Sequence, residues 1–99
     1  MYIVNTTFIV SPSVHGNWYK FMIDKFIPTL IQKKVFTRLL SDQVEKHFTY
    51  SLQVYVEDIA EYKLFTEETL LEYQQFATEM FDTEVMHFTS LLKIIKTVS

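Results

Sequence analysis

The segment from Phe48 to Val56 constrains the fold more than any other part of the sequence. Apolar or aromatic side chains occupy every second position, and most of the intervening positions are polar. This period of two is typical of a half-buried antiparallel strand, which presents one face to a core. The first segment, Tyr2–Val10, is also rich in β-branched and aromatic residues and carries Tyr2, Val4, Phe8 and Val10 on one face. The chain is therefore expected to build an antiparallel sheet with one buried face.

Two longer segments have the period of a helix. Ser11 followed by Pro12 is typical of a helix start, because the hydroxyl can cap the first turn and proline fits its first position. We expect this helix to run to about Lys34 and to kink or break near Phe26, because Pro28 has no backbone N–H to donate. Its apolar row is Val14, Trp18, Met22, Phe26 and Leu30.

A second helix is predicted from Asp58 to about Phe81. Asp58 and Glu61 together resemble a capping box, with the aspartate as the cap. Steps of three and four residues predict the buried stripe Ile59, Tyr62, Thr66, Thr69, Tyr73, Phe76 and Met80. Leu64 and Leu71 fall on the opposite side, among glutamates. This leucine pair suits a helix or subunit contact, unless a change of helix phase near Thr66 accounts for it.

Two further strands complete the pattern. Residues Val35–Ser41 form one, joined to Phe48–Val56 by a polar connection at Asp42–His47, and the last runs from Glu84 to about Lys96. The order β-α-β-β-α-β predicts an α+β protein of the ferredoxin-like type, with four antiparallel strands in one layer and two helices on one face. A single domain over residues 1–99 is expected, because about 100 residues can bury a core without disulfides or metals.

The composition excludes several kinds of chemistry. The chain has no cysteine, so it has no disulfide, thiolate metal site or cysteine nucleophile. Its single glycine excludes the glycine-rich loops that bind phosphates and dinucleotides. Residues 1–50 hold six basic and three acidic side chains, and residues 51–99 hold three and nine. Only Lys33 and Lys34 adjoin one another, so we expect no nucleic-acid binding.

The first 19 residues carry no Lys, Arg, Asp or Glu, which raises the question of a signal peptide or membrane anchor. A signal peptide needs a basic segment before a continuous apolar run, and a membrane helix needs about 20 mostly apolar residues. Asn5, Thr6, Thr7 and Ser11 interrupt the run here. We therefore expect a cytoplasmic protein without membrane contact.

The candidate binding site is the sheet face that the helices leave open. If the even-numbered residues of the first, third and fourth strands pack under the helices, this face carries Ile3, Asn5, Thr7, Ser51, Gln53, Tyr55, His87, Thr89 and Leu91. A half-apolar open face invites association, so we expect a homodimer whose two faces enclose a cleft for a small polar molecule. Arg38 joins this set only if the register of its strand allows. The candidate ligand-binding residues are Asn5, Arg38, Gln53, Tyr55 and His87.

Several segments resemble the domain-of-unknown-function family 4286. They are Val14-His15 with Trp18 and Met22, Phe26-Ile27-Pro28, Thr49–Tyr55, and Phe81-Asp82 leading to Phe88–Leu92. The sequence departs from the family pattern at Phe26, where members tend to have histidine, and at Lys34-Val35-Phe36, where they tend to have glycine before the phenylalanine. The resemblance implies a ferredoxin-like fold of the dimeric α+β barrel group, in which the sheets of two subunits pack face to face. It implies no activity.

No residue is assigned to catalysis or to a metal, and no cofactor is expected. None of His15, His47 and His87 has a partner at metal-ligand spacing. Two alternatives to a ligand-binding dimer stay open. One is a cofactor-independent oxygenase or isomerase of the dimeric α+β barrel type, which would need His87 or Tyr55 in an enclosed pocket. The other is a protein-interaction module that uses the leucine pair.

Overall fold

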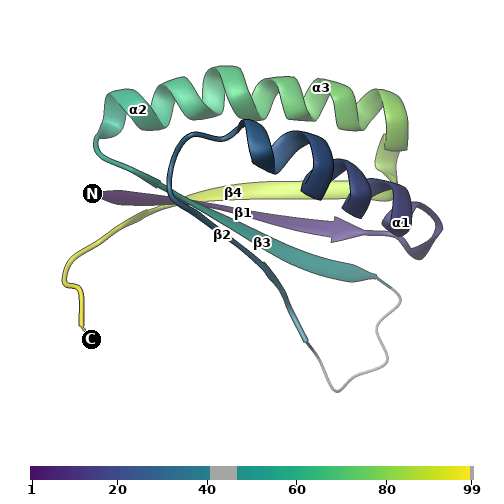
Figure 1. Cartoon of the computed structure of the whole chain (residues 1–99), viewed down its shortest axis with the longest axis horizontal. Coiled ribbons are helices and arrows are strands. Elements are labelled where there is room, and N and C mark those ends of the chain that lie inside the picture. The colour runs from purple at the N-terminus through teal and green to yellow at the C-terminus, as the bar shows by residue number, and fades with distance from the viewer. Residues whose placement is uncertain (41–46, 99) are drawn as a thin grey trace.

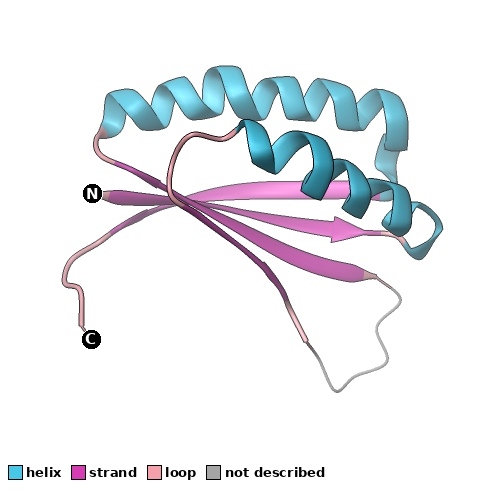
Figure 2. Ribbon diagram, in the orientation of Figure 1, coloured by secondary structure: helices cyan, strands magenta, loops and turns pink. Residues whose placement is uncertain are grey.

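Four antiparallel strands form one open sheet, and two helical segments pack against one of its faces (Figures 1 and 2). The computed structural model describes residues 1–40 and 47–98. The predicted α+β class with an antiparallel sheet is confirmed. The strand order is β2-β3-β1-β4. The strands are β1 (Tyr2–Val10), β2 (Lys34–Arg38), β3 (Phe48–Val56) and β4 (Val85–Lys93).

The bounds of β1 and β3 are those predicted, whereas β2 and β4 are shorter. Strand β2 ends at Arg38, and β4 ends at Lys93, three residues before the expected Lys96. The polar connection predicted at Asp42–His47 lies outside the described residues except for His47 itself.

The first helical segment consists of α1 (Pro12–Phe21), a π-helical turn (Met22–Phe26) and a 3-10 turn (Ile27–Thr29). It ends at Thr29 rather than near Lys34, because Pro28 sits in the last turn and Leu30 is already extended. The predicted apolar row holds, since four of its members are buried and Val14 packs against them. Ser11 occupies the capping position, but its hydroxyl makes no capping hydrogen bond, so that prediction is wrong.

The second helical segment consists of α2 (Ile59–Leu64), a π-helical turn (Phe65–Thr69) and α3 (Leu70–Phe81). Its start is the predicted one. Asp58 Oδ1 accepts a hydrogen bond from the Glu61 backbone N–H at 2.8 Å, which satisfies one of the unpaired donors of the first turn.

The stripe predicted for this segment holds in part. Tyr73 is buried, and the partly buried Tyr62 and Phe76 pack against the core, whereas Ile59 and Met80 are exposed. The π-helical turn contains one residue more than an α-helical turn, so the buried positions Phe65 and Leu70 lie five residues apart. The residues that face the sheet are therefore Phe65, Leu70, Tyr73, Ala77 and Phe81.

The change of helix phase near Thr66 does not bury the leucine pair. The Thr66 hydroxyl donates to the Tyr62 carbonyl oxygen at 3.1 Å, inside the disturbed turn. Leu64 and Leu71 remain 56% and 46% exposed on the outer side of the segment. Their predicted exposure is confirmed.

The register of the sheet decides which side chains the helices cover. Strand β1 pairs with both β3 and β4, so that Phe8 lies opposite Tyr50 on one side and His87 on the other. Directly opposed residues share a face. The helices therefore cover the even-numbered residues of β1, β2 and β3 but the odd-numbered residues of β4. The expected orientation of β4 is wrong: its covered residues are Val85, His87, Thr89, Leu91 and Lys93.

The core is centred on Phe8, which has no exposed surface. Its ring lies 5.4 Å from the Trp18 ring of α1 and 5.3 Å from the Tyr73 ring of α3. The buried Trp18 Nε1–H donates to the Tyr73 hydroxyl at 2.9 Å. Burial raises the pKa of Tyr73 to about 12, so this hydroxyl stays protonated at neutral pH.

The hydrogen bond between the helices gives a direct test of this core. Tyr73→Phe leaves the buried indole N–H without its acceptor, and we expect the free energy of unfolding to fall by about 1–3 kcal/mol. Tyr19→Phe is the matched control, because Tyr19 is exposed. Urea denaturation of both variants measures the difference. Equal stabilities would show that the hydrogen bond contributes nothing.

Candidate functional site

Three of the five candidate ligand-binding residues lie together on the open face of the sheet. Asn5 of β1 is directly opposite Gln53 of β3, and the next pair on this face is Ile3 with Tyr55. The Ser51 hydroxyl donates to Asn5 Oδ1 at 2.6 Å. This bond orients the Asn5 amide and leaves its NH₂ group as a donor for another acceptor.

Arg38 does not belong to this group. It is opposite Tyr50 in the pairing of β2 with β3, which places it on the helix side of the sheet. Its guanidinium carbon lies 4.7 Å from the centre of the Phe48 ring. A cation at this distance from an aromatic face is attracted by the ring.

His87 also lies on the helix side, so its expected position on the open face is wrong. Its ring centre is 6.1 Å from that of Phe8 and 5.5 Å from that of Tyr73. Burial lowers the pKa of His87, which keeps the imidazole neutral at neutral pH. The enzyme alternative needs either His87 or Tyr55 in an enclosed pocket, and these two side chains lie on opposite faces of the sheet.

The strand positions on the open face carry apolar and polar side chains but no charged ones. The more apolar side of β4 points outward, with Met86 60% and Phe88 57% exposed. Along the four described strands, none of the positions on this face is charged, whereas charged residues make up 21% of the chain. These positions are Ile3, Asn5, Thr7, Ile9, Val35, Thr37, Thr49, Ser51, Gln53, Tyr55, Met86, Phe88, Ser90 and Leu92.

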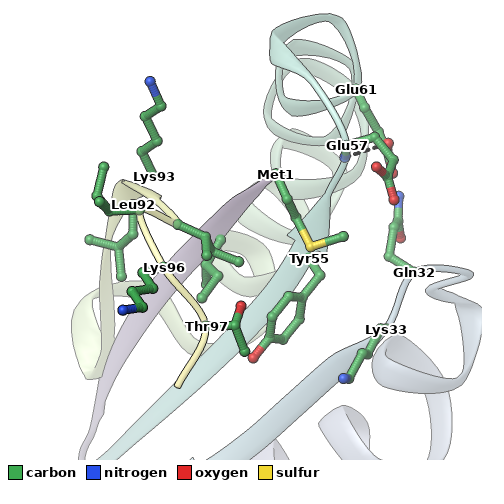
Figure 3. Close-up of a pocket in the computed structure, with 13 residues that line it drawn as sticks. Met1, Gln32, Lys33, Tyr55, Glu57, Glu61, Leu92, Lys93, Lys96 and Thr97 are labelled. Carbon is green, nitrogen blue, oxygen red and sulfur yellow. Dashed lines mark hydrogen bonds between the residues drawn. The ribbon is translucent and has the colours of Figure 1, made fainter. Parts of the chain in front are cut away.

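A groove of about 840 Å³ lies at one end of this face, where Tyr55 forms part of its lining. Figure 3 shows the Tyr55 side chain between Thr97 of the C-terminal segment and Lys33. Lys33 Nζ is 5.1 Å from the centre of the Tyr55 ring. The rim also holds Lys96 and Glu61, so both signs of charge surround an aromatic and aliphatic floor.

A second group of polar side chains on the helix side was not assigned from the sequence. His15 Nε2 and the Tyr50 hydroxyl are 2.7 Å apart, and the His15 ring stacks on Phe48 with centres 3.7 Å apart. Burial, and then the nearby charge of Arg38, lower the pKa of His15. Burial also raises the pKa of Tyr50. Since 35 residues separate the pair, no local spacing could reveal it.

Residues 1–95 match the family described as Domain of unknown function (DUF4286). The chain belongs to the DUF4286 family. The resemblance noted in the sequence is thereby confirmed. No curated protein and no solved structure matches the chain significantly.

The described part of this DUF4286 protein contains neither a metal-ligand cluster nor a membrane-spanning helix. Over residues 1–40 and 47–98, no group of three or more His, Cys, Asp or Glu side chains is placed to hold a metal ion. Within the same residues, no helix combines the length and the apolar character needed to cross a bilayer.

The electrostatics around His15 can be measured directly. We expect NMR titration to place the pKa of His15 below 6.5, and Arg38→Gln to raise it because that variant removes a nearby positive charge. Lys33→Gln removes a charge from the opposite face and should leave the value unchanged. A pKa of 6.5 or more in the native protein would contradict the burial of His15 beside Arg38.

The lowered pKa values of His15 and His87 also predict how stability depends on pH. In the unfolded chain both groups take up a proton near pH 6.5, whereas in the folded protein they do so only at lower pH. The unfolded state therefore gains protons first, so the free energy of unfolding should fall as the pH drops from about 7.5 to about 5.5. His15→Gln should reduce this slope in denaturation curves, and an unchanged slope would contradict the prediction.

Proposed function

We propose that two copies of this DUF4286 protein associate through their open sheet faces and hold a small polar molecule in the cleft between them. The observation that carries the proposal is the absence of charge along the strands of this face. A sheet face that meets only water ordinarily carries charged side chains, whereas depletion of charge and exposed large apolar residues are typical of interface centres. Met86, Phe88 and Leu92 would form the apolar part of such an interface.

The polar residues of the face supply the ligand-binding part of the proposal. Asn5, Gln53 and Tyr55 offer donors and acceptors at strand positions of this face, and Tyr55 also lines the groove. The groove volume of about 840 Å³ falls within the roughly 300–1,000 Å³ of small-molecule sites. A second copy would cover its open side and exclude water from the ligand.

We also propose that the layout is ferredoxin-like, with its sheet packed face to face against that of the partner. The strand order β2-β3-β1-β4 and the position of both helical segments on one face support this assignment. Charged strand residues lie on the helix side, at Lys34, Arg38 and Lys93. The two helical segments already cover that side, so the open face is the one left for a partner sheet.

The alternative of a protein-interaction module rests on the leucine pair. Leu64 and Leu71 are exposed on the outer side of the second helical segment, with Glu67 and Glu68 between them. Two apolar residues within an acidic helix face would suit a partner helix that carries basic residues at its edge. This surface and the open sheet face lie on opposite sides of the molecule, so the two functions can be tested separately.

The dimer is tested by paired charge substitutions. In sedimentation experiments at micromolar concentration, we expect the native protein to have twice the chain mass. Phe88→Glu should raise the dimer dissociation constant at least about tenfold, because the carboxylate would be buried without a partner. Leu71→Glu introduces the same charge on the outer helix face and should leave the dimer intact.

Two outcomes would contradict the dimer. A native protein that stays monomeric throughout the micromolar range would remove it. Dissociation by Leu71→Glu alone would move the contact to the helices and favour the interaction module. Circular dichroism of each variant distinguishes dissociation from unfolding.

The ligand is tested on the dimer by thermal denaturation in the presence of small polar metabolites. A compound that binds only the folded protein raises its melting temperature. We expect Gln53→Ala and Tyr55→Phe to reduce that rise, and Thr83→Ala, in the turn before β4, to preserve it. If no compound shifts the melting temperature of the native protein, the open face is an interface without a ligand.

A further inference from the structure

A second pocket, of about 380 Å³, lies on the helix side of the sheet. Its lining comes from α1, β2 and β3 and consists of His15, Tyr19, Phe36, Thr37, Arg38 and Tyr50. The groove of the open face lies at the other end of β3, near Tyr55. The two hollows therefore share no lining residue, and each can be tested without the other.

Among the described residues that line the pocket, Arg38 supplies a permanent positive charge and none is acidic. Arg38 is also the only arginine of the chain. The Phe48 ring lies beside its guanidinium group, 4.7 Å from the guanidinium carbon. A guanidinium held against a ring still donates hydrogen bonds from its edge, in a fork that matches a carboxylate.

The second polar element of the pocket is the pair formed by His15 and Tyr50. Their 2.7 Å separation joins a ring nitrogen to a hydroxyl, and in one tautomer the imidazole donates to the Tyr50 oxygen. The Tyr50 O–H is then available as a donor to a ligand. Burial lowers the pKa of His15 and raises that of Tyr50, so the pair is uncharged at neutral pH.

The remaining walls are aromatic. The Phe36 and Tyr50 rings are stacked, with centres 5.2 Å apart and planes inclined by 9°. The Tyr19 ring lies 6.5 Å from Phe36 and 5.8 Å from Tyr50. Such walls favour a flat apolar ligand, because ring surfaces pack in offset or edge-to-face geometry. A volume of about 380 Å³ is at the lower end of the range for small-molecule sites, which suits a single-ring compound.

We propose that this pocket binds a small aromatic monocarboxylate. The carboxylate pairs with the Arg38 guanidinium and accepts a hydrogen bond from the Tyr50 hydroxyl, and the ring of the ligand packs against Tyr19 and Phe36. His15 is a positioning residue that sets the direction of the Tyr50 hydroxyl. The site is separate from the dimer cleft proposed for the open face.

Benzoate is the probe for this site, and benzamide is its neutral counterpart. NMR titration of the native protein should show saturable shifts of Tyr19, Phe36 and Tyr50 signals with benzoate, and at least about tenfold weaker binding of benzamide. Arg38→Gln should weaken benzoate binding at least about tenfold. Tyr50→Phe should weaken it less, because it removes a single hydrogen bond.

Lys33→Gln is the matched control, since it removes one positive charge from the groove on the opposite face. It should leave benzoate affinity unchanged. Arg38→Lys keeps the charge and removes the fork, so intermediate affinity would support paired recognition of the carboxylate. Circular dichroism establishes that each variant is folded.

Three results would overturn the proposal. One is the absence of benzoate shifts at Tyr19 and Phe36 up to about 10 mM, and another is equal affinity of native protein and Arg38→Gln. The third is loss of binding in Lys33→Gln, which would assign the anion to the groove of the open face. The NMR signals of individual residues report where benzoate binds. This test therefore remains valid even if the protein proves to be monomeric.

Discussion

Both helical segments are held on the sheet through the ring of Phe8. This side chain is fully buried in the middle of β1, and it contacts Trp18 from one helical segment and Tyr73 from the other. The hydrogen bond from Trp18 to Tyr73 closes the contact between the helices. With this cluster on one face of the sheet, both helical segments lie on that side, and residues 94–97 line the groove at one end of the opposite face. The open face is thus a direct consequence of the core.

The order of strands and helices could be predicted because hydrophobic periods differ clearly along this chain. Strand β3 alternates cleanly and β1 is rich in β-branched and aromatic residues, and the bounds and covered faces of both agree with the prediction. In the first helical segment the apolar row repeats every four residues, and the π-helical turn at Met22–Phe26 accommodates that spacing. In the second segment the π-helical turn at Phe65–Thr69 shifts the buried stripe after Phe65. The spacing of apolar residues in the sequence does not reveal this turn.

The orientation of β4 could not be predicted, because both of its faces contain apolar residues. The even-numbered face, with Met86, Phe88 and Leu92, is the more apolar one, and pattern alone favours its burial. The register is instead fixed at the ends of the strands, where the Ser11 backbone N–H donates to the Glu84 carbonyl oxygen at 2.9 Å. This contact pairs Val10 with Val85 and turns the apolar side outward. Of the candidate residues, His87 was misplaced for this reason, and Asn5, Gln53 and Tyr55 lie on the expected face. The face of Arg38 depended on the pairing of β2 with β3, which places it on the helix side.

Met1 and the segment that follows β4 meet at the groove. The Ile94 backbone N–H donates to the Met1 carbonyl oxygen at 3.1 Å, and Met1 lines the groove together with residues 94–97 (Figure 3). A segment joined ahead of Met1, such as an affinity tag, would leave the protein beside this groove and next to the open face. Tagged protein could therefore be blocked at this site by its own extension. Measurements of assembly or ligand binding should use protein from which tags have been cleaved.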